Sequence, residues 1–466
     1  MSGEPHLLAL AGAEPGCYWL DDPDEPDATD TLVEAETADL CVVGGGYTGL
    51  WTALLAKERD PNRDVVLLEG GRCGSGASGR NGGFFESSLT HGVSQGLSKF
   101  APELPLLEKL GLDNLNEIER FVAKHQIDCD WERNGVIDVA TRSEHMPDLA
   151  EQAMHLEALG QDIELLDAER MQAEVHSPTY HGGLVRKKRA AVCDPARLVF
   201  GMKQVALDAG VRIFEDTNVT ELIERDHAVE LRAGYGSVRA AKVALGTNAR
   251  LPAAAASDAP WCRSTTMSSP PSRSPPSSST PSAGRDARAA SDSTNQFHYY
   301  RLTYDNRIIW GGYDAVYYFN NKVDPQLEQR PETFALLSKH FFETFPQLEG
   351  LHFSHVWGGA IDTSTRFTVF WGRAMGNKVV YAMGYTGLGA SATRFGARAM
   401  LDLLDKRDSP IVGLDFVNKK PLPFPPEPLR WAGIQMTRWS LDKEDRTGER
   451  NLWLRSLDRI GLGFDS

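Results

Sequence analysis

Residues 40–69 read L-C-V-V-G-G-G-Y-T-G-L-W-T-A-L-L-A-K-E-R-D-P-N-R-D-V-V-L-L-E. An apolar run leads into the pattern Gly44-x-Gly46-x-x-Gly49, which is followed by a helix-like run, a second apolar run and an acid. In such a unit the first glycine permits a tight turn, the second lets the backbone approach a pyrophosphate, and the third lets the helix pack closely on the sheet. The new helix directs free N–H groups at phosphates. Glu69, 20 residues after Gly49, can accept hydrogen bonds from both hydroxyls of a ribose. The stretch therefore predicts a βαβ dinucleotide-binding unit.

Length and composition place this unit in a large globular protein. The chain has 466 residues, of which 41% are hydrophobic and 24% charged, enough for two or three intertwined domains. The net charge of −15 argues against nucleic acid and anionic membranes as partners. The basic run Arg186–Arg189 (R-K-K-R) is the local exception. A solvated loop is the favoured explanation for that run, and a site for an acidic substrate group is the alternative.

The cysteines and the hydropathy of the chain indicate in which compartment the protein is found and whether it binds a metal. The six cysteines are scattered and form no C-x-x-C pair, so the sequence predicts neither a metal site nor a disulfide framework. The N-terminus lacks a signal-peptide pattern, and no apolar run approaches 18 residues. We therefore expect no membrane span and a cytoplasmic protein.

Periodicity and helix-capping signals divide the rest of the chain. Residues 1–38 are acidic and proline-bearing and predict a surface arm, and residues 105–175 look mainly helical. Asp194-Pro195 is typical of a helix start, and this helix is expected to run to Gly210. Further elements are expected as strands at 211–214, as a strand pair near 228–245, as strands at 356–361, 367–371 and 379–383, and as helices at 331–345 and 390–404. The aromatic amphipathic stretch 429–441 is expected to pack on its own domain, with a partner helix as the alternative.

Two glycine-rich segments decide which dinucleotide is bound. An NAD domain normally continues with alternating strands and helices after its first unit. Here the loop 70–83 (G-G-R-C-G-S-G-A-S-G-R-N-G-G) follows at once, and it can wrap around a longer cofactor and donate hydrogen bonds to it. The late turn 384–389 (G-Y-T-G-L-G) opens a second helix, whose N–H groups suit the pyrimidine end of a flavin. These features favour FAD over NAD.

Together these motifs resemble a known family. The glycine pattern, Glu69, the loop 74–83, Asp194–Leu198, Val243–Asn248 and the stretch 356–389 are similar to the D-amino-acid-oxidase-like superfamily of FAD enzymes, and most of all to its γ-glutamylputrescine-oxidase-like amine oxidoreductases. The resemblance implies an α/β (mixed α+β) fold: a glutathione-reductase-like FAD-binding Rossmann domain with an interleaved β-sheet/helix substrate domain. The implied division is an arm at 1–38, an FAD-binding domain at 39–95, 190–250 and 355–410, a substrate domain at 96–189 and 295–354, and a C-terminal extension at 411–466.

The same resemblance implies the cofactor contacts. Relatives often carry histidine where Leu388 stands, so the backbone donors there, and not a side chain, are expected to meet the flavin. No cysteine lies beyond Cys262, which makes the cysteinyl flavin link of some relatives unavailable and predicts non-covalent FAD. The implied FAD-binding residues are Gly44, Gly46, Tyr47, Thr48, Gly49, Glu69, Gly70, Arg72, Gly76, Ala77, Ser78, Arg80, Asn81, Gly82, Gly83, Val219 (adenine region), Gly246, Thr247, Gly384, Gly387, Leu388 and Gly389.

The implied reaction is oxidation of a C–N bond in an amine or amino acid. A hydride would pass to flavin N5, the imine would hydrolyse, and dioxygen or another acceptor would take the electrons, with peroxide formed in the case of dioxygen. The alternatives are an amino-acid or N-methyl-amine dehydrogenase with a quinone or protein acceptor, and a catalytically impaired FAD-binding protein. Candidate substrate-pocket residues on presumed strands are Tyr299, Arg301, Tyr313 and Trp357, where packing within the sheet is the competing explanation.

One segment does not match its surroundings. Residues 251–294 are dominated by Ser, Pro, Ala and Arg, with almost no strand or helix formers. A disordered linker fits this composition and a mobile lid fits its position, although structureless stretches of this length are uncommon inside compact domains. A third hypothesis is that the stretch is translated out of frame, since G/C-rich codons can be chosen so that another frame of residues 260–284 reads as a strand, a turn and a helix start.

Overall fold

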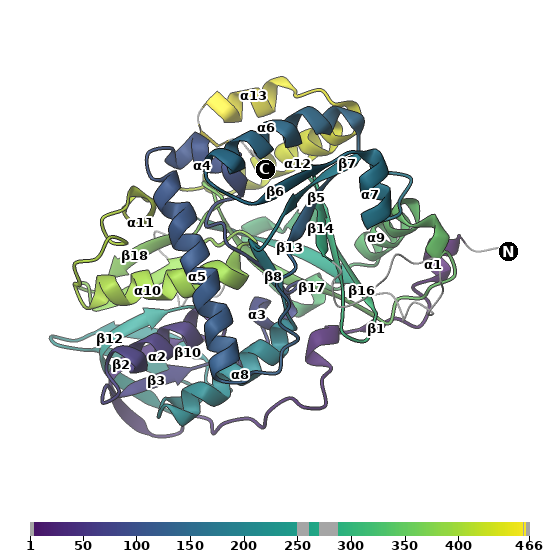
Figure 1. The fold of residues 1–466 in the computed structure, drawn as a ribbon. Helices are drawn as coiled ribbons and strands as arrows, with labels where there is room; N and C mark the ends of the chain where they lie inside the picture. The colour runs from purple at the N-terminus through teal and green to yellow at the C-terminus, as the bar shows by residue number, and fades with distance from the viewer. Residues whose placement is uncertain (1–3, 249–260, 270–287, 460, 463–466) are drawn as a thin grey trace.

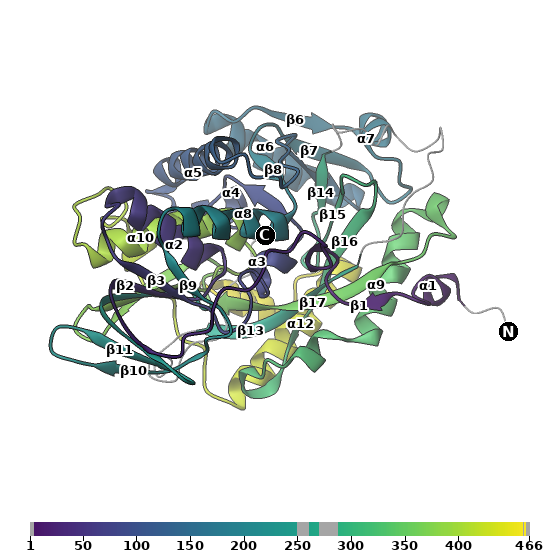
Figure 2. The ribbon, with the colours of Figure 1, turned by 90° about the horizontal axis from the view of Figure 1, so that it is seen from below.

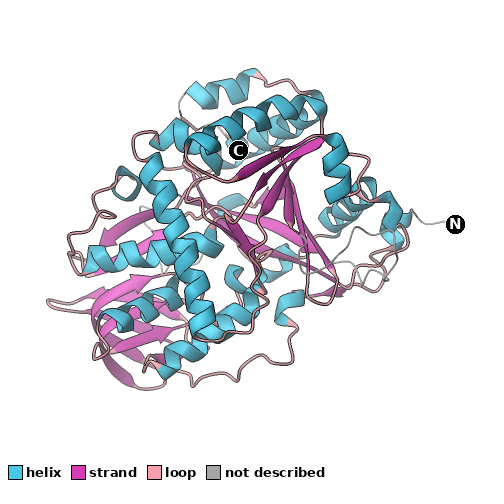
Figure 3. Ribbon diagram, in the orientation of Figure 1, coloured by secondary structure: helices cyan, strands magenta, loops and turns pink. Residues whose placement is uncertain are grey.

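Two large β-sheets, each with helices packed against it, make up the described part of the chain (Figures 1 and 3). The computed structural model describes residues 4–248, 261–269, 288–459 and 461–462, with the backbone alone for residues 261–269, 313 and 314. This mixed α/β architecture, with a sheet for each of two halves, is the predicted fold class.

The first sheet contains the predicted βαβ unit. Its strands β2, β3, β12 and β19 run parallel, and β10 and β11 extend it as an antiparallel pair. In order across the sheet the strands are β10 (Val219–Glu224), β11 (Val229–Ala233), β12 (Ser237–Leu245), β2 (Ala35–Val43), β3 (Val65–Leu68) and β9 (Arg212–Phe214), with β19 (Val379–Met383) pairing β12 and β18 (Phe370–Ala374) pairing β19. The last four residues of β2 and all of β3 are buried, because both faces of the sheet are covered.

Helices pack on one face of this sheet and form the largest core. Leu50, Ala53 and Leu54 of α2 are buried there, as the helical spacing predicts. On the opposite face, Cys41 and Val43 of β2 belong to a separate core that includes the β10–β11 pair. The helices of the large core are α2 (Tyr47–Arg59), α5 (Leu104–Lys124), α8 (Pro195–Asp208) and α10 (Gly389–Leu404).

The second sheet has nine strands and forms the other half of the molecule. In order they are β1 (Glu14–Pro15), β17 (His355–Ser364), β13 (Trp261–Ser269), β16 (Ile308–Tyr317), β15 (His298–Leu302), β14 (Ala289–Asp292), β5 (Val136–Ala140), β7 (Gly182–Arg186) and β6 (Ile163–Leu166). Strand β17 lies within the predicted segment 355–410 but pairs with β13 and β1 in this second sheet. A third, two-stranded sheet of β4 (Phe84–Glu86) and β8 (Ala190–Val192) lies between the halves.

Of the remaining helices, α11 (Asp415–Asn418) packs beside β18 and adds to the large core, and the others cover the second sheet and the region where the halves meet (Figure 1). Phe334, Leu337 and Phe341 of α9 pack in the core beneath the second sheet. The helices are α1 (Pro5–Leu8), α3 (Ala77–Arg80), α4 (Gly92–Phe100), α6 (Met146–Ala158), α7 (Ala168–Glu174), α9 (Pro331–Thr344), α11 (Asp415–Asn418), α12 (Leu429–Thr447) and α13 (Leu452–Arg459). None of the described helices combines the length and the apolar character needed to cross a bilayer.

The N-terminal segment is not the predicted surface arm. Trp19 is 3% exposed and Leu32 is 2% exposed, and β1 adds to the edge of the second sheet. Figure 2 shows this purple segment running from α1 beside the second sheet across to β2 in the first. The acidic composition led to the wrong prediction, because a few buried apolar residues (Ala9, Trp19 and Leu32) fix the segment to the rest of the chain, while Leu7, Leu8 and Val33 are exposed.

Two other expectations differ from the structure. Residues 105–175 are helical only in part, since β5 and β6 interrupt the helices and pair with β7.

Within the anomalous segment 251–294, β13 pairs with both β16 and β17, and β14 pairs with β5 and β15. Backbone pairing on both sides supports these strands despite their composition. The rest of that segment lies outside the described residues, and the frame hypothesis stays a prediction that sequencing of the gene would test.

Candidate active site

A cavity of about 1400 Å³ runs between the two sheets. This volume exceeds the 300–1,000 Å³ (roughly) of an ordinary small-molecule pocket. One end is lined by glycines of the first sheet, and the other by polar side chains of β4, α5, β5 and β7. Residues of α12 and α13 form a further part of the wall, but Trp431, Met436 and Trp439 of α12 are exposed, so packing on its own domain and a partner helix both stay predictions for the stretch 429–441.

Close backbone approaches build the glycine-lined end. Gly44 has φ +106°, and a Cβ at this position would lie 2.6 Å from the carbonyl oxygen of Gly246. A Cβ on Gly49 would lie 1.8 Å from the carbonyl oxygen of Gly44. Gly46 caps α2, and Gly46, Tyr47 and Thr48 at its start line the cavity. Gly44 therefore makes the tight turn and Gly49 the close packing that their spacing predicts, and the role of Gly46 beside a pyrophosphate stays a prediction.

Glu69 lines the cavity at the end of β3. Its Oε2 accepts a hydrogen bond from Gly45 N at 2.5 Å, and its Oε1 accepts one from Gly71 N at 2.9 Å. A carboxylate oxygen can accept more than one hydrogen bond. The backbone thus holds the carboxylate in a fixed position at the place where a ribose is expected.

The loop 74–83 is shaped by its own side chains. Ser78 Oγ accepts a hydrogen bond from Tyr47 N at 2.9 Å, which ties α3 to the start of α2. Asn81 Nδ2 donates to the carbonyl oxygens of Ala77 and Ser78, and Asn81 Oδ1 accepts from Gly83 N at 2.8 Å. This loop therefore forms a preorganised wall of the cavity.

The late glycine turn faces a buried acid. Gly384 and Gly387 have φ +73° and +89°, and α10 begins at Gly389. Asp362 is 2% exposed, and its carboxylate accepts the N–H of Gly384. Burial raises the pKa of Asp362 to about 7, although hydrogen bonds from the backbone oppose this rise.

His91 lies against the same turn. Its Nε2 is 2.8 Å from the carbonyl oxygen of Thr386, and its ring meets that of Phe367 edge to face. Burial lowers the pKa of His91 to about 4, so the imidazole is neutral near pH 7. The imidazole thus adds no positive charge beside this turn near pH 7.

The glycine-lined end fits an FAD molecule. Thr247 Oγ1 is buried in the cavity wall and has no hydrogen-bond partner among the described residues, as expected of an atom that awaits a ligand. The N-termini of α2 and α10 both open on the cavity, where they suit phosphate groups and the developing negative charge of a reduced flavin. A Cβ at Gly44 would clash with the backbone of Gly246 at this end of the cavity.

Most of the predicted cofactor residues lie in the cavity wall. The structure brings together residues from four separate parts of the chain at this end. The lining residues are Gly44, Gly46, Tyr47, Thr48, Glu69, Gly76, Ala77, Ser78, Arg80, Asn81, Gly82, Gly246, Thr247, Gly387, Leu388 and Gly389.

Six predicted cofactor residues lie outside the wall, among the residues that the structure describes. Arg72 instead contacts Glu25 and Glu215 at 3.4 and 3.5 Å. Val219 is packed in the core below the first sheet. Gly49, Gly70, Gly83 and Gly384 support the backbone next to the lining residues and do not line the cavity themselves.

Of the candidate substrate-pocket residues, Tyr299 lines the cavity. Arg301 and Trp357 do not: the Arg301 guanidinium donates to Cys193 O at 2.5 Å, and Trp357 Nε1 donates to Arg80 O at 3.0 Å. Both side chains are buried and hold neighbouring loops in place. The Tyr313 side chain lies outside the described residues.

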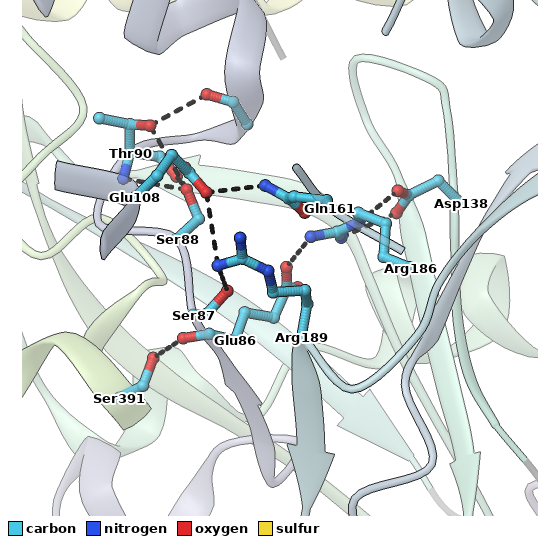
Figure 4. A network of polar contacts seen from close by, with 11 residues as sticks. Glu86, Ser87, Ser88, Thr90, Glu108, Asp138, Gln161, Arg186, Arg189 and Ser391 are labelled. Atoms are coloured by element: carbon cyan, nitrogen blue, oxygen red, sulfur yellow. Dashed lines mark hydrogen bonds and ion pairs between the residues drawn. The ribbon is translucent and has the colours of Figure 1, made fainter. Parts of the chain in front are cut away.

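The polar end of the cavity contains residues that the sequence did not reveal (Figure 4). Arg186 and Arg189, expected in a solvated loop, belong to a buried network with Glu86, Glu108 and Asp138. The prediction of a solvated loop was wrong. Arg186 is the last residue of β7 and Arg189 directly precedes β8, so only Lys187 and Lys188 lie between the two arginines in the turn. The apolar runs on each side of R-K-K-R could have indicated two strands joined by a short turn.

Possible metal ligands occur elsewhere. Glu14, Asp21 and His355 bring their ligand atoms within 4.8 Å of one another, although two of the three side chains are exposed. None of the three belongs to the cavity wall that the described residues form.

Comparisons with known proteins agree with this geometry. Residues 39–403 match the family model DAO, described as FAD dependent oxidoreductase. The chain is 32% identical over 383 residues to the gamma-glutamylputrescine oxidoreductase of Escherichia coli K12, covering 80% of this chain and 85% of that protein. It is 27% identical over 410 residues to the probable oxidoreductase OrdL of Haemophilus influenzae, covering 85% and 90%. Among solved structures, glycine oxidase from Geobacillus kaustophilus superimposes with a TM-score of 0.66 at 17% identity, covering 80% of this chain and 96% of that chain, which supports the fold.

Proposed function

Because this chain belongs to the DAO family of FAD-dependent oxidoreductases, we propose that it oxidises the C–N bond of an amine or amino acid. The single cavity that joins the glycine-lined end to a chamber of side chains carries the proposal. A cofactor in the glycine-lined end would present its ring to a substrate in that chamber. The names of the relatives, a gamma-glutamylputrescine oxidoreductase and a glycine oxidase, support a nitrogen-bearing substrate.

The FAD contacts divide by type. Gly44, Gly46 and the N-terminus of α2 would hold the pyrophosphate, and Glu69 the adenosine ribose. The backbone N–H groups of Gly387–Gly389 would meet the pyrimidine edge. We propose that the FAD is non-covalent. Bound FAD supplies the two-electron chemistry by accepting a hydride from the carbon next to nitrogen.

Two side chains of the protein would shape the place where the substrate binds, one by packing and one by its lack of charge. Tyr299 supplies an aromatic wall, and its ring is held edge to face against Phe84. Neutral His91 adds no positive charge near the glycine turn, so it does not repel an amine. Substrate orientation would thus depend on packing and on the polar end of the cavity.

The test is an anaerobic reduction of the bound flavin. The FAD-loaded protein is mixed with polyamines, γ-glutamyl amines, N-methyl amino acids and D-amino acids, and the loss of the oxidised flavin absorbance is followed. We expect at least one class to bleach the flavin, and the matched hydroxy acid of an active amino acid to leave it oxidised. A protein that takes up FAD but is bleached by none of these compounds would disprove the proposal.

The electron acceptor is resolved by a second measurement. With the active amine, peroxide formed in air identifies an oxidase. Reduction of a quinone analogue without peroxide identifies a dehydrogenase.

A further inference from the structure

The polar end of the cavity is continuous with the flavin end through β4. Ser391, in the first turn of α10, donates from Oγ to Glu86 O at 2.5 Å. Glu86 is the last residue of β4, which follows directly on the glycine loop 74–83. Its side chain lines the same cavity and is 28% exposed. Glu86 therefore lies next to the expected position of the flavin, on the substrate side.

The donors of Arg186 are directed at acids of the protein itself. Arg186 Nε and Nη2 donate to the two carboxylate oxygens of Asp138 at 2.7 and 3.1 Å. Arg186 Nη1 donates to Glu86 Oε2 at 2.7 Å. Figure 4 shows the guanidinium between the two carboxylates. Burial alone would lower the pKa of Arg186, but the charges of Asp138 and Glu86 raise it above its ordinary value.

A second acid closes the network on the α5 side. Glu108 Oε2 accepts from Gln161 Nε2 at 2.7 Å and lies 3.8 Å from Arg189 Nη1. Three carboxylates thus face two guanidiniums, and Arg189 lies behind the cavity wall. Carboxylates thus outnumber guanidiniums in the wall that a ligand meets here, although burial raises the pKa of Glu108 and of Asp138. An anionic group at this position would meet Glu86 before it met a free arginine donor.

We infer that Glu86 is a specificity-determining residue that binds a second, non-reacting ammonium group of the substrate. The inference rests on the proposed function and names its substrate class: diamines or longer polyamines, with one nitrogen at the flavin and the other at Glu86. Glu86 Oε2 is held by Arg186, while no hydrogen bond to Oε1 occurs among the described residues. A charge-assisted hydrogen bond from an ammonium group can form there at low cost because the carboxylate is already oriented.

The test compares putrescine with butylamine, which lacks the second amine. In the FAD-loaded protein, flavin reduction by putrescine should be more efficient, in kcat/KM, by about 10- to 100-fold. Glu86→Gln should remove this preference by raising KM for putrescine, with butylamine unchanged. Glu119→Gln is the matched control, since Glu119 forms a similar carboxylate–guanidinium pair with Arg133 at 2.6 Å but does not line the cavity. This control should keep the preference.

A direct binding measurement separates the inference from the proposed function. Titration calorimetry of putrescine into the protein should show binding that Glu86→Gln weakens by the same factor, whether or not the flavin is reduced. If Glu86→Gln fails to fold, Glu86→Asp replaces it, and the shorter acid should shift the preference toward cadaverine. Equal handling of putrescine and butylamine by the unmodified protein, or equal losses for both in Glu86→Gln, would overturn the inference.

Discussion

The glycine-lined end and the polar end of the cavity are built by opposite means. At the first end, absent side chains let backbones approach, as where Gly49 packs against Gly44. At the second, long side chains from β4, α5, β5 and β7 meet in a network of ion pairs. Backbone geometry thus builds the end where we propose that FAD binds, and side-chain chemistry builds the end where we propose that the substrate binds.

The largest expected effect is at the glycine-lined end. Gly49→Ala would place a Cβ 1.8 Å from Gly44 O, so α2 would have to move away from β2. We expect the free energy of unfolding to fall by more than about 4 kcal/mol and FAD to be lost on desalting. Urea unfolding and flavin absorbance measure the two effects.

A matched glycine at the other side of the cavity is the control. Gly433, inside α12, has open space around its Cβ position. Gly433→Ala should leave stability unchanged or raise it by up to about 1 kcal/mol. If both alanines were tolerated equally, close approach would not be what builds the glycine-lined end.

The next effect is at the polar end. Arg186→Leu leaves the half-buried carboxylates of Glu86 and Asp138 without their common cation, and should lower the free energy of unfolding by about 2 kcal/mol. Its neighbour Lys187 forms a more exposed pair with Glu164 at 2.8 Å, so Lys187→Leu should cost less than about 1 kcal/mol. Denaturant unfolding distinguishes the two, and equal losses would contradict a buried network.

Asp362, between the two ends, should make stability depend on pH. Its pKa is about 7 in the folded protein and about 4 when unfolded, so the folded state holds a proton that unfolding releases. Its contribution to stability is therefore fully present below about pH 4 and is lost as pH rises to about 7, by up to roughly 1.4 kcal/mol per pH unit.

Asp362→Asn should flatten this slope, because an amide oxygen still accepts the Gly384 N–H but cannot ionise. Unfolding free energies of both proteins between pH 4 and 7 (roughly the window set by the two pKa values) measure the difference. Parallel curves for the two proteins would show that Asp362 does not titrate in this range.

The smallest effect separates ligand binding from stability. Thr247→Val removes a buried hydroxyl that has no partner among the described residues, so stability without FAD should not fall. FAD affinity should weaken by about five- to tenfold, the value of one hydrogen bond.

Thr368 is the matched control for this prediction. Its Oγ1 is also buried without a partner in the described part of the chain, but it lies outside the cavity wall. Thr368→Val should leave FAD affinity unchanged. Equal affinity losses in the two variants, measured by fluorescence titration of FAD, would remove Thr247 from the FAD site.

Residues close in sequence were predicted well. The strand–glycine–helix–strand order of residues 40–69, the cap at Asp194 and the helix from Gly389 all follow from short-range patterns. Asp194, for example, accepts hydrogen bonds from Ala196 N and Arg197 N at 2.9 and 3.0 Å. Such contacts join residues two or three apart, so a sequence window contains both partners.

Residues far apart in sequence were predicted poorly. Tyr299 and Arg301 share one face of β15, yet Tyr299 reaches the cavity and Arg301 packs against the loop at Cys193. The arginines of R-K-K-R looked solvated because their acidic partners are distant in sequence: for Arg186 they lie 48 and 100 residues away, far outside any local sequence pattern. The strand β13 shows the same limit, since its pairing with β16 and β17 outweighs its composition.

The sequence by itself therefore determined the family, the βαβ unit and the backbone contacts that suit FAD. These depend on glycine spacing, helix starts and one acid, all of which act within about 30 residues. The tertiary structure alone decided which side chains line the polar end of the cavity. That choice depends on how β4, α5, β5 and β7 meet, and a pairing such as Glu86 with Arg186 exists only once both sheets have formed around the cavity.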